Sequence, residues 1–264
     1  MTGRDPPTLD GMELVDNAPL RTAVAAFAAE SNQATYWEVL RNTLQGDILF
    51  DITGSSITMS DDGSTINKGS TIGFLGGTGP DGGRALFAYT RQAEAVRMHP
   101  ETPNDVQTLG QPAASALEFA ASQGYAWLYI DPAGPTCALQ LADVDFALRT
   151  LHNDAVKDAL ATGDKLRVID ALAAGGQLLY GVEELPDGVR VRTSATPQDE
   201  PVALAFTSAP EVVCRNATDA WSAIDISRIV ADALAAPFAG LVLNPAGPWM
   251  MLDHDDLLAV QSRL

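Results

Sequence analysis

The sequence holds three histidines and two cysteines, the residue types that most often carry metal, acid–base or nucleophilic chemistry. One histidine, His254, lies in the acidic run Asp253-His254-Asp255-Asp256. A bound metal ion needs three or more ligands that converge in space, whereas adjacent residues at the start of a helix diverge. Asp255 and Asp256 are better placed to face the positive end of a helix dipole. We therefore expect no metal in this run and no cofactor.

The remaining histidines and the cysteines do not form a pattern that predicts covalent catalysis. His99 and His152 stand beside predicted loops or helix ends, and neither has a nearby serine or cysteine in a recognisable nucleophile turn. Cys137 and Cys214 are far apart and outside any Cys-x-x-Cys pair, so we expect buried free thiols. The sequence assigns no catalytic residue and favours a protein that is not an enzyme.

Residues 77–82 match the Gly-x-Gly-x-x-Gly pattern in form only. A dinucleotide site needs a strand before this pattern and a helix after it, so that the amides at the helix start face the pyrophosphate. Here a strand is predicted to follow at residues 85–89, and Pro80 lacks an amide hydrogen. We therefore expect a mobile hairpin region within a glycine-rich insertion over residues 60–84.

The chain is strongly and evenly acidic. It carries 16 basic and 34 acidic residues, a formal charge of −18, of which −10 falls in residues 1–150 and −8 in residues 151–264. Binding of phosphate groups needs clustered lysine and arginine, so this charge argues against nucleic acid and anionic membrane as partners. The same surface suits a protein partner that is basic.

Two five-residue turns, each at the end of an apolar run, are the most regular feature of the sequence. Asp131-Pro132-Ala133-Gly134-Pro135 follows residues 127–130, and Asn244-Pro245-Ala246-Gly247-Pro248 follows residues 241–243. Asp or Asn before Pro initiates turns, Pro fixes φ, and Gly supplies a positive φ. The turns predict tight connections between adjacent strands. Alternatively, they present backbone groups to a partner at a strand end, where open αβ sheets often bind ligands.

Trp249 directly follows the second turn. Aromatic side chains with a polar edge are enriched in the hot spots of interfaces, which makes this residue a candidate for partner binding. The candidate interaction residues are Asp131, Pro132, Gly134, Asn244, Pro245, Gly247 and Trp249.

Other landmarks recur in the same order around these turns. A helix led by asparagine is expected after Asn17 and again after Asn153, and a strand ending in Phe/Tyr-Thr is expected near residues 86–90 and 203–207. Thr90 is expected to cap the short helix that follows it. The order predicts an α+β fold with two tandem homologous αβ domains, each a small mixed β-sheet packed with helices. Their expected ranges are 15–150 and 151–264, after a disordered tail at 1–14.

The landmarks resemble the SseB-like family, named for enhanced serine sensitivity. The residues that carry the resemblance are Tyr89-Thr90 with Asp131-Pro132-Ala133-Gly134, and Phe206-Thr207 with Asn244-Pro245-Ala246-Gly247. The resemblance covers nearly the whole chain as two copies, and the first copy has Asp131 where the second has Asn244. It implies cytoplasmic bacterial αβ domains, and it carries over no catalytic residue because the family has no established reaction.

The expected function is that of a non-enzymatic interaction or adaptor protein, which binds a protein partner through the strand-end turns or a groove between the domains. One alternative is an acidic immunity or inhibitor protein that neutralises a basic toxin or nuclease. Another is an enzyme or small-molecule sensor, which needs a deep pocket with convergent polar groups. Residues 1–16 lack the basic start and apolar core of a signal peptide, and no apolar run reaches about 18 residues, so a cytoplasmic location is expected.

Overall fold

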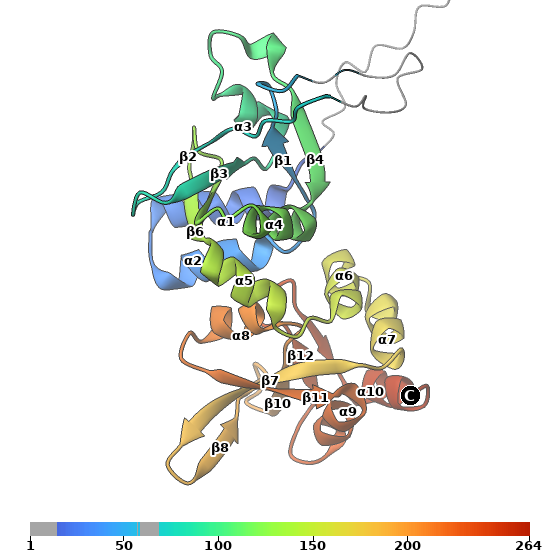
Figure 1. Ribbon diagram of the computed structural model, residues 1–264. Coiled ribbons are helices and arrows are strands. Elements are labelled where there is room, and N and C mark those ends of the chain that lie inside the picture. The colour runs from blue at the N-terminus through green and yellow to red at the C-terminus, as the bar shows by residue number, and fades with distance from the viewer. Residues whose placement is uncertain (1–14, 57, 59–68) are drawn as a thin grey trace, which may run out of the picture. The chain divides into compact units, whose positions relative to one another are not determined.

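The computed structural model describes residues 15–56, 58 and 69–264, and the chain divides into two compact units, residues 1–148 and 149–264 (Figure 1). Helices and strands alternate irregularly in both units, which confirms the predicted α+β class. The tail expected at residues 1–14 and the first part of the glycine-rich insertion lie outside the described residues. In the part of the chain that the structure describes, every helix is too short or too polar to cross a bilayer.

The first unit combines a two-stranded and a four-stranded sheet. Strands β1 and β4 pair antiparallel, and the larger sheet has the order β2-β3-β5-β6, in which β3 and β5 are parallel and the other pairs antiparallel. The elements of this unit are α1 (Ala18–Ala29), α2 (Gln33–Asn42), β1 (Asp47–Asp51), β2 (Gly76–Thr78), β3 (Arg84–Ala88), α3 (Gln92–Val96), a 3-10 turn (Pro103–Asp105), β4 (Thr108–Pro112), α4 (Ala113–Ser122), β5 (Trp127–Ile130), β6 (Cys137–Gln140) and α5 (Leu141–Arg149).

The main core of this unit lies on one face of the four-stranded sheet. Alternate residues of a strand point to opposite faces, and Leu86, Leu128 and Ile130 point to the same one, where they are fully buried. Side chains of α1, α2, α4 and α5 complete this apolar cluster. A smaller cluster around Tyr89 and Leu49 lies apart from it, against α3. The parallel pair β3–β5 is thus held from its core face by helices.

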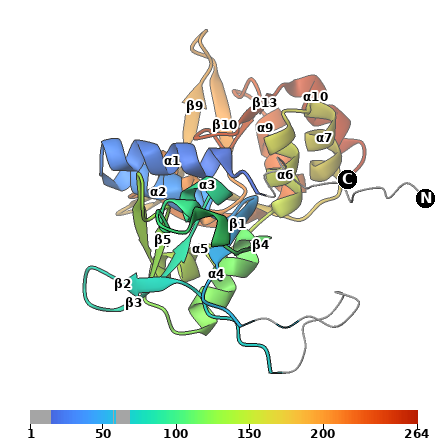
Figure 2. The same ribbon diagram turned by 90° about the horizontal axis from the view of Figure 1, so that it is seen from above.

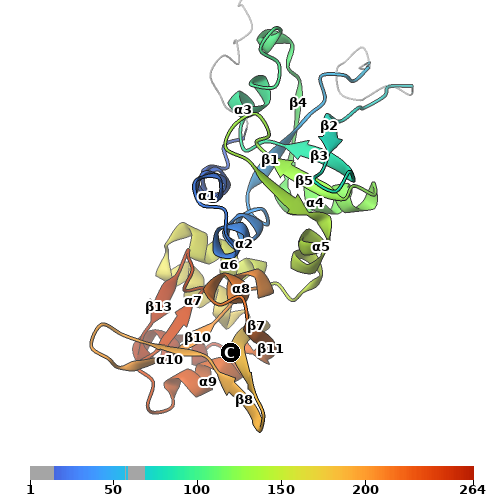
Figure 3. The same cartoon turned by 90° about the vertical axis from the view of Figure 1, so that its left-hand side faces the viewer.

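The second unit also has two sheets. The order β11-β7-β8, whose strands are labelled in Figure 3, is antiparallel throughout, and the order β13-β12-β10-β9 contains the parallel pair β10–β12. Its elements are α6 (Asp154–Thr162), α7 (Lys165–Ala173), β7 (Gln177–Leu185), β8 (Gly188–Val191), β9 (Thr193–Ala195), β10 (Pro201–Ala205), α8 (Ala209–Arg215), β11 (Ala220–Asp225), α9 (Ile226–Leu234), β12 (Leu241–Leu243), β13 (Met250–Leu252) and α10 (His254–Gln261). Strands β9 and β11 are additions to the predicted elements.

The two units make the same set of bonds at the start of their first helix. The side chain of Asn17 accepts a hydrogen bond from Leu20 N at 3.2 Å, and that of Asn153 accepts one from Val156 N at 3.1 Å. Each asparagine also donates to a main-chain oxygen just before or at the next strand, Gln45 O at 2.8 Å or Gln177 O at 3.1 Å. One residue type therefore caps the helix and ties it to the sheet in both units.

The glycine-rich pattern at residues 77–82 covers the end of β2 and its connection to β3 (Figure 2). A Cβ on Gly77 would lie 2.7 Å from Cζ of Phe87, and one on Gly79 would overlap the indole ring of Trp127. The same indole donates its N–H to Asp81 Oδ1 at 2.6 Å. Gly77 and Gly79 allow the hairpin to lie against two aromatic rings, whereas Gly82 supplies a positive φ of 86° in the turn.

Substitution Gly79→Ala is expected to destabilise the chain by about 1–3 kcal/mol, because the new methyl group requires the hairpin or the Trp127 ring to move. Gly54→Ala is the matched control, since a Cβ there meets nothing within 4 Å. Urea denaturation of both variants and the wild type gives the free energies of unfolding. Equal losses in the two variants would show that contact with Trp127 does not require glycine at position 79.

Candidate interaction site

Both predicted turns lie at the carboxyl end of a parallel strand pair. Asp131 follows β5, and its N–H donates to Ala88 O on β3 at 2.9 Å. Asn244 follows β12, and its N–H donates to Ala205 O on β10 at 3.0 Å. Each turn then leads directly into the antiparallel neighbour, β6 or β13. The turns therefore connect adjacent strands, and each stands beside the end of the strand parallel to its own.

The first residue of each turn bonds to a threonine at that neighbouring strand end. The carboxylate of Asp131 accepts from Thr90 N at 2.9 Å and from Thr90 Oγ1 at 2.7 Å. Asn244 Oδ1 accepts from Thr207 N at 2.9 Å, and its Nδ2 donates to Thr207 Oγ1 at 2.8 Å. We call each of these two-bond contacts an Asx–Thr lock. The locks lie deep in their units, since Asp131 is 3% exposed and Asn244 is 0% exposed.

The expectation that Thr90 caps the following helix is wrong. Helix α3 has Arg91 at its N-cap position, without a side-chain hydrogen bond to the cap. The Thr90 hydroxyl donates to the buried carboxylate of Asp131 instead, because Thr90 lies one residue before the N-cap position and beside the turn that follows β5. The pairing of Thr with Asx was absent from the sequence prediction. Its sequence signal is partial, since Asx directly follows one strand of the parallel pair, whereas Thr comes two residues after the end of the other.

The other candidate residues lie along the outer part of the turns. Gly134 N donates to Asp131 O at 3.1 Å, and Gly247 N donates to Asn244 O at 2.7 Å. Pro132 and Pro245 are half-buried. Trp249 is different, because 62% of it is exposed directly after the second turn. The structure therefore directs Asp131 and Asn244 into the fold and Trp249 toward solvent.

A set of paired charges surrounds the first turn. Glu94 is almost completely buried, and it accepts hydrogen bonds from Arg91 at 2.9 Å and from Arg97 at 2.6 Å. A Cβ on Gly134 would lie 2.9 Å from Arg97 Nη1, so the turn lies against this group. In the second unit the acidic residue of the short helix is Glu211, which lies 3.5 Å from the Lys157 ammonium. Buried carboxylates in both units are thus accompanied by cations.

The two locks have the same geometry and different electrostatics. Burial raises the pKa of the Asp131 carboxyl to about 6, and the charge of Glu94 adds to this, although the hydrogen bonds from Thr90 act in the opposite direction. Asn244 occupies the corresponding place in the second unit without any charge. Only the lock of the first unit therefore responds to pH near neutrality.

The histidines and cysteines lie in separate environments. His99 bonds to the buried carboxylate of Asp51, whereas His254 Nε2 lies 2.9 Å from Phe238 O. Cys137 is buried, which raises the pKa of its thiol to about 12, and Cys214 is half-buried. Across residues 15–56, 58 and 69–264, no three His, Cys, Asp or Glu side chains are grouped to hold a metal ion.

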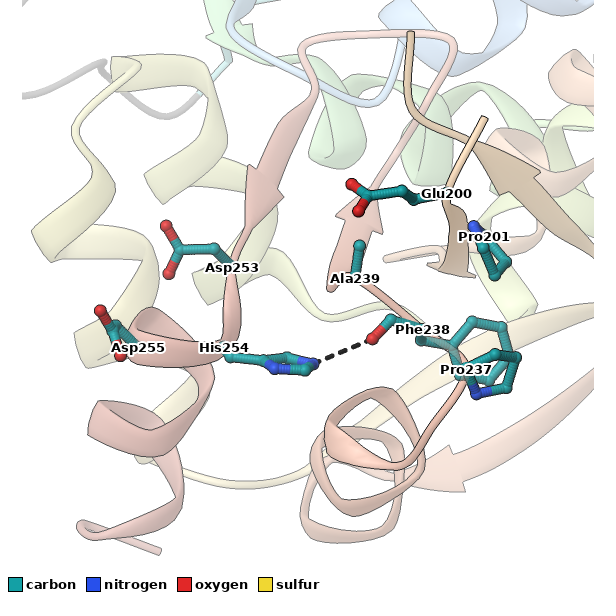
Figure 4. A pocket seen from close by; sticks show the side chains of 8 residues that line it. All are labelled: Glu200, Pro201, Pro237, Phe238, Ala239, Asp253, His254 and Asp255. Carbon is teal, nitrogen blue, oxygen red and sulfur yellow. Dashed lines mark hydrogen bonds between the residues drawn. The ribbon is translucent and has the colours of Figure 1, made fainter. Parts of the chain in front are cut away.

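An acidic hollow of about 560 Å³ opens at the other end of the second parallel pair (Figure 4). Glu200 and Pro201 stand at the start of β10, Ala239 lies just before β12, and Asp253 follows β13. Pro237, Phe238, His254 and Asp255 complete the lining. Asp253 and Asp256 also form a capping box at the start of α10, and Asp255 and Asp256 lie in its first turn as predicted. The acidic run therefore begins a helix and also borders the hollow.

The fold and the lock define the first unit as a small αβ domain whose parallel strand ends are tied together by Asp131 and Thr90. Residues 20–145 match the family model described as the SseB protein N-terminal domain. The first unit therefore belongs to that family, as the resemblance of its motifs predicted. No curated protein and no solved structure matches the chain.

Substitution Asp131→Asn is expected to raise stability at neutral and alkaline pH. Folding raises the pKa of Asp131 from 3.8 to about 6, so the folded chain holds this proton where the unfolded chain has lost it. The resulting stability is complete below pH 3.8 and is lost as pH rises through about 6. Relative to the variant, the free energy of unfolding of the wild type should fall by about 2–3 kcal/mol over this pH range.

Asn244→Asp is the reciprocal control, because it introduces a carboxyl into the same geometry and should create a similar pH dependence. Urea denaturation of the wild type and both variants from about pH 4 to pH 8 measures the difference, with all other titrating groups held in common. Parallel stability profiles for wild type and Asp131→Asn would contradict the assignment of this titration to Asp131.

Proposed function

We propose that the chain is a non-enzymatic, cytoplasmic interaction protein made by tandem duplication of an SseB-like domain, and that it binds a protein partner around the turn that ends at Trp249. Both units contain a parallel strand pair, a following antiparallel strand and an Asx–Thr lock. The asparagine at the start of the first helix also bonds to the lock threonine in each, as Asn17 N to Thr90 O and Asn153 N to Thr207 O. These shared bonds support the duplication.

The observation that carries the binding function is the exposure of Trp249 on a turn held in one conformation. The lock fixes Asn244 at the start of this turn, and the bond from Gly247 N to Asn244 O closes it. Exposing a large aromatic ring costs hydrophobic free energy, and tryptophan is the residue type most enriched in binding hot spots. A rigid turn loses little conformational entropy when a partner binds. The exposed ring is therefore suited to anchor a protein contact.

Substitution Trp249→Ala is expected to remove most partner capture from a native cytoplasmic extract, since truncating a hot-spot tryptophan costs at least about 2 kcal/mol, roughly thirtyfold in affinity. Leu166→Ala is the matched control, because Leu166 is 70% exposed and lies on α7, away from the turn in sequence. Quantitative mass spectrometry of proteins retained by tagged wild type and each variant gives the comparison.

Thermal unfolding of each variant establishes that the fold is kept, which is expected because the Trp249 side chain is mostly exposed. The same retained proteins with wild type and Trp249→Ala would contradict the proposal. If Leu166→Ala loses the retained proteins as Trp249→Ala does, the capture depends on general surface hydrophobicity.

A further inference from the structure

Strand β13, which begins directly after Trp249, is an edge strand of its sheet (Figure 3). Its pairing with β12 fixes which of its main-chain groups face outward. Gly240 O accepts from Ala203 N, and Asn244 N donates to Ala205 O, so even-numbered residues of this segment bond to β10. The alternate residues Leu241 and Leu243 therefore face β13, where they stand opposite Leu252 and Met250.

It follows that the main-chain groups of Met251, which stands opposite Val242, point away from β12. Those of Trp249 share this direction, because N–H and C=O groups alternate sides along a strand. Among the described residues, no side chain and no loop bonds to the N–H or C=O of either residue. The edge of β13 is therefore available for pairing with another strand.

The corresponding edge of the first unit is bonded at one end in the same way. Gln140 N on β6 donates to the hydroxyl of Tyr36 at 3.1 Å, and that hydroxyl donates to Asp143 Oδ2 at 2.6 Å. In register Gln140 corresponds to Asp253, whose N–H donates to Asp256 Oδ2, and Ala138 corresponds to Met251. An open row of backbone groups templates the addition of a strand, and among the described residues the middle of this row is unbonded in both units. What distinguishes the second unit is the exposed Trp249, which stands where the first unit has Thr136.

The two ends of this edge differ in chemistry. Trp249 lies at the start of β13, and Asp253 follows its last residue, at the border of the acidic hollow. They are four positions apart, about 13 Å at the usual rise per residue. Asp255 adds a second exposed carboxylate at this end, whereas Glu200 stands two strands further in, at the start of β10. An extended segment along the edge meets an apolar ring at one end and clustered negative charge at the other.

We propose that β13 accepts an extended, basic segment of a protein partner as an additional strand, with an apolar residue against Trp249 and lysine or arginine beside Asp253 and Asp255. This inference rests on the proposed function and names the class of its partner. Backbone bonds to Met251 supply affinity without demanding a particular sequence, and the two ends supply selectivity. The net charge of −18 attracts such a segment over the range of the Debye length.

The test uses the full-length chain and a synthetic fluorescent peptide, Lys-Lys-Thr-Val-Thr-Val-Thr-Lys-Lys, which places cations at both ends and so serves either strand direction. A second peptide has every lysine replaced by glutamate. Fluorescence anisotropy measures binding at low salt and at about 0.5 M salt, where screening shortens the Debye length. The lysine peptide is expected to bind, more weakly at high salt, and the glutamate peptide is not.

Met251→Pro removes the outward N–H and is compatible with an edge strand, because that N–H makes no bond to β12. It is expected to weaken binding of the lysine peptide at least tenfold, and Asp255→Asn is expected to weaken it about two- to fivefold, the range of an exposed ion pair. Met251→Leu keeps the N–H and should bind within about twofold of wild type. Because the proline variant depends on correct folding, amide hydrogen exchange of Met251 in the wild-type chain is followed as well, and the peptide should protect it.

Failure of the lysine peptide to bind, unchanged exchange at Met251 on binding, or equal affinity for a folded Met251→Pro variant each overturns strand addition. The capture experiment separates this failure from that of the proposed function. If Trp249→Ala loses the native partners and Met251→Pro retains them, the partner contacts the tryptophan without adding a strand, and only the proposed function stands. If Trp249→Ala retains them, the proposed function fails irrespective of the peptide.

Discussion

The lock between two parallel strand ends is the contact on which each unit depends. Parallel strands are joined only by long crossovers, so nothing local holds their carboxyl ends in register. Asp131 and Asn244 provide this hold by satisfying both the N–H and the hydroxyl of a buried threonine. A buried polar group left without a partner costs about 1–3 kcal/mol, so the residues of each lock depend on one another. The position of the turn, and of Trp249 after it, follows from this contact.

The sequence predicted what is encoded locally. The Asx-Pro-x-Gly pattern marked both strand ends, because Pro and Gly restrict the backbone within a few residues. The lock was not predicted, since its partners are 41 residues apart in one unit and 37 in the other. Thr90 was assigned to the nearest helix for the same reason. Strand β11 was missed because the exposure of its residues does not alternate, which leaves no period-two pattern to detect.

In the candidate site, too, only the features formed by residues close together in the sequence could be predicted. Exposure of Trp249 is consistent with its place after a turn, which the sequence displays directly. The acidic hollow required the fold, because Glu200, Phe238 and Asp253 come from three separated segments. The open edge of β13 required the strand order. These features depend on tertiary pairing, for which a single sequence offers no periodic signal.

The two units differ most at positions where the shared fold allows more than one residue type. Asn244 makes both bonds of the lock without a charge, so the geometry does not require the carboxylate of Asp131. The first unit keeps that carboxylate at the cost of desolvation. The second unit has a neutral lock and an exposed indole directly after its turn. Under the proposed duplication, the bonds that set the fold were retained in both copies, while the charge of the lock and the exposure of the residue after the turn diverged. Under the proposed function, this divergence assigns partner binding to the second copy.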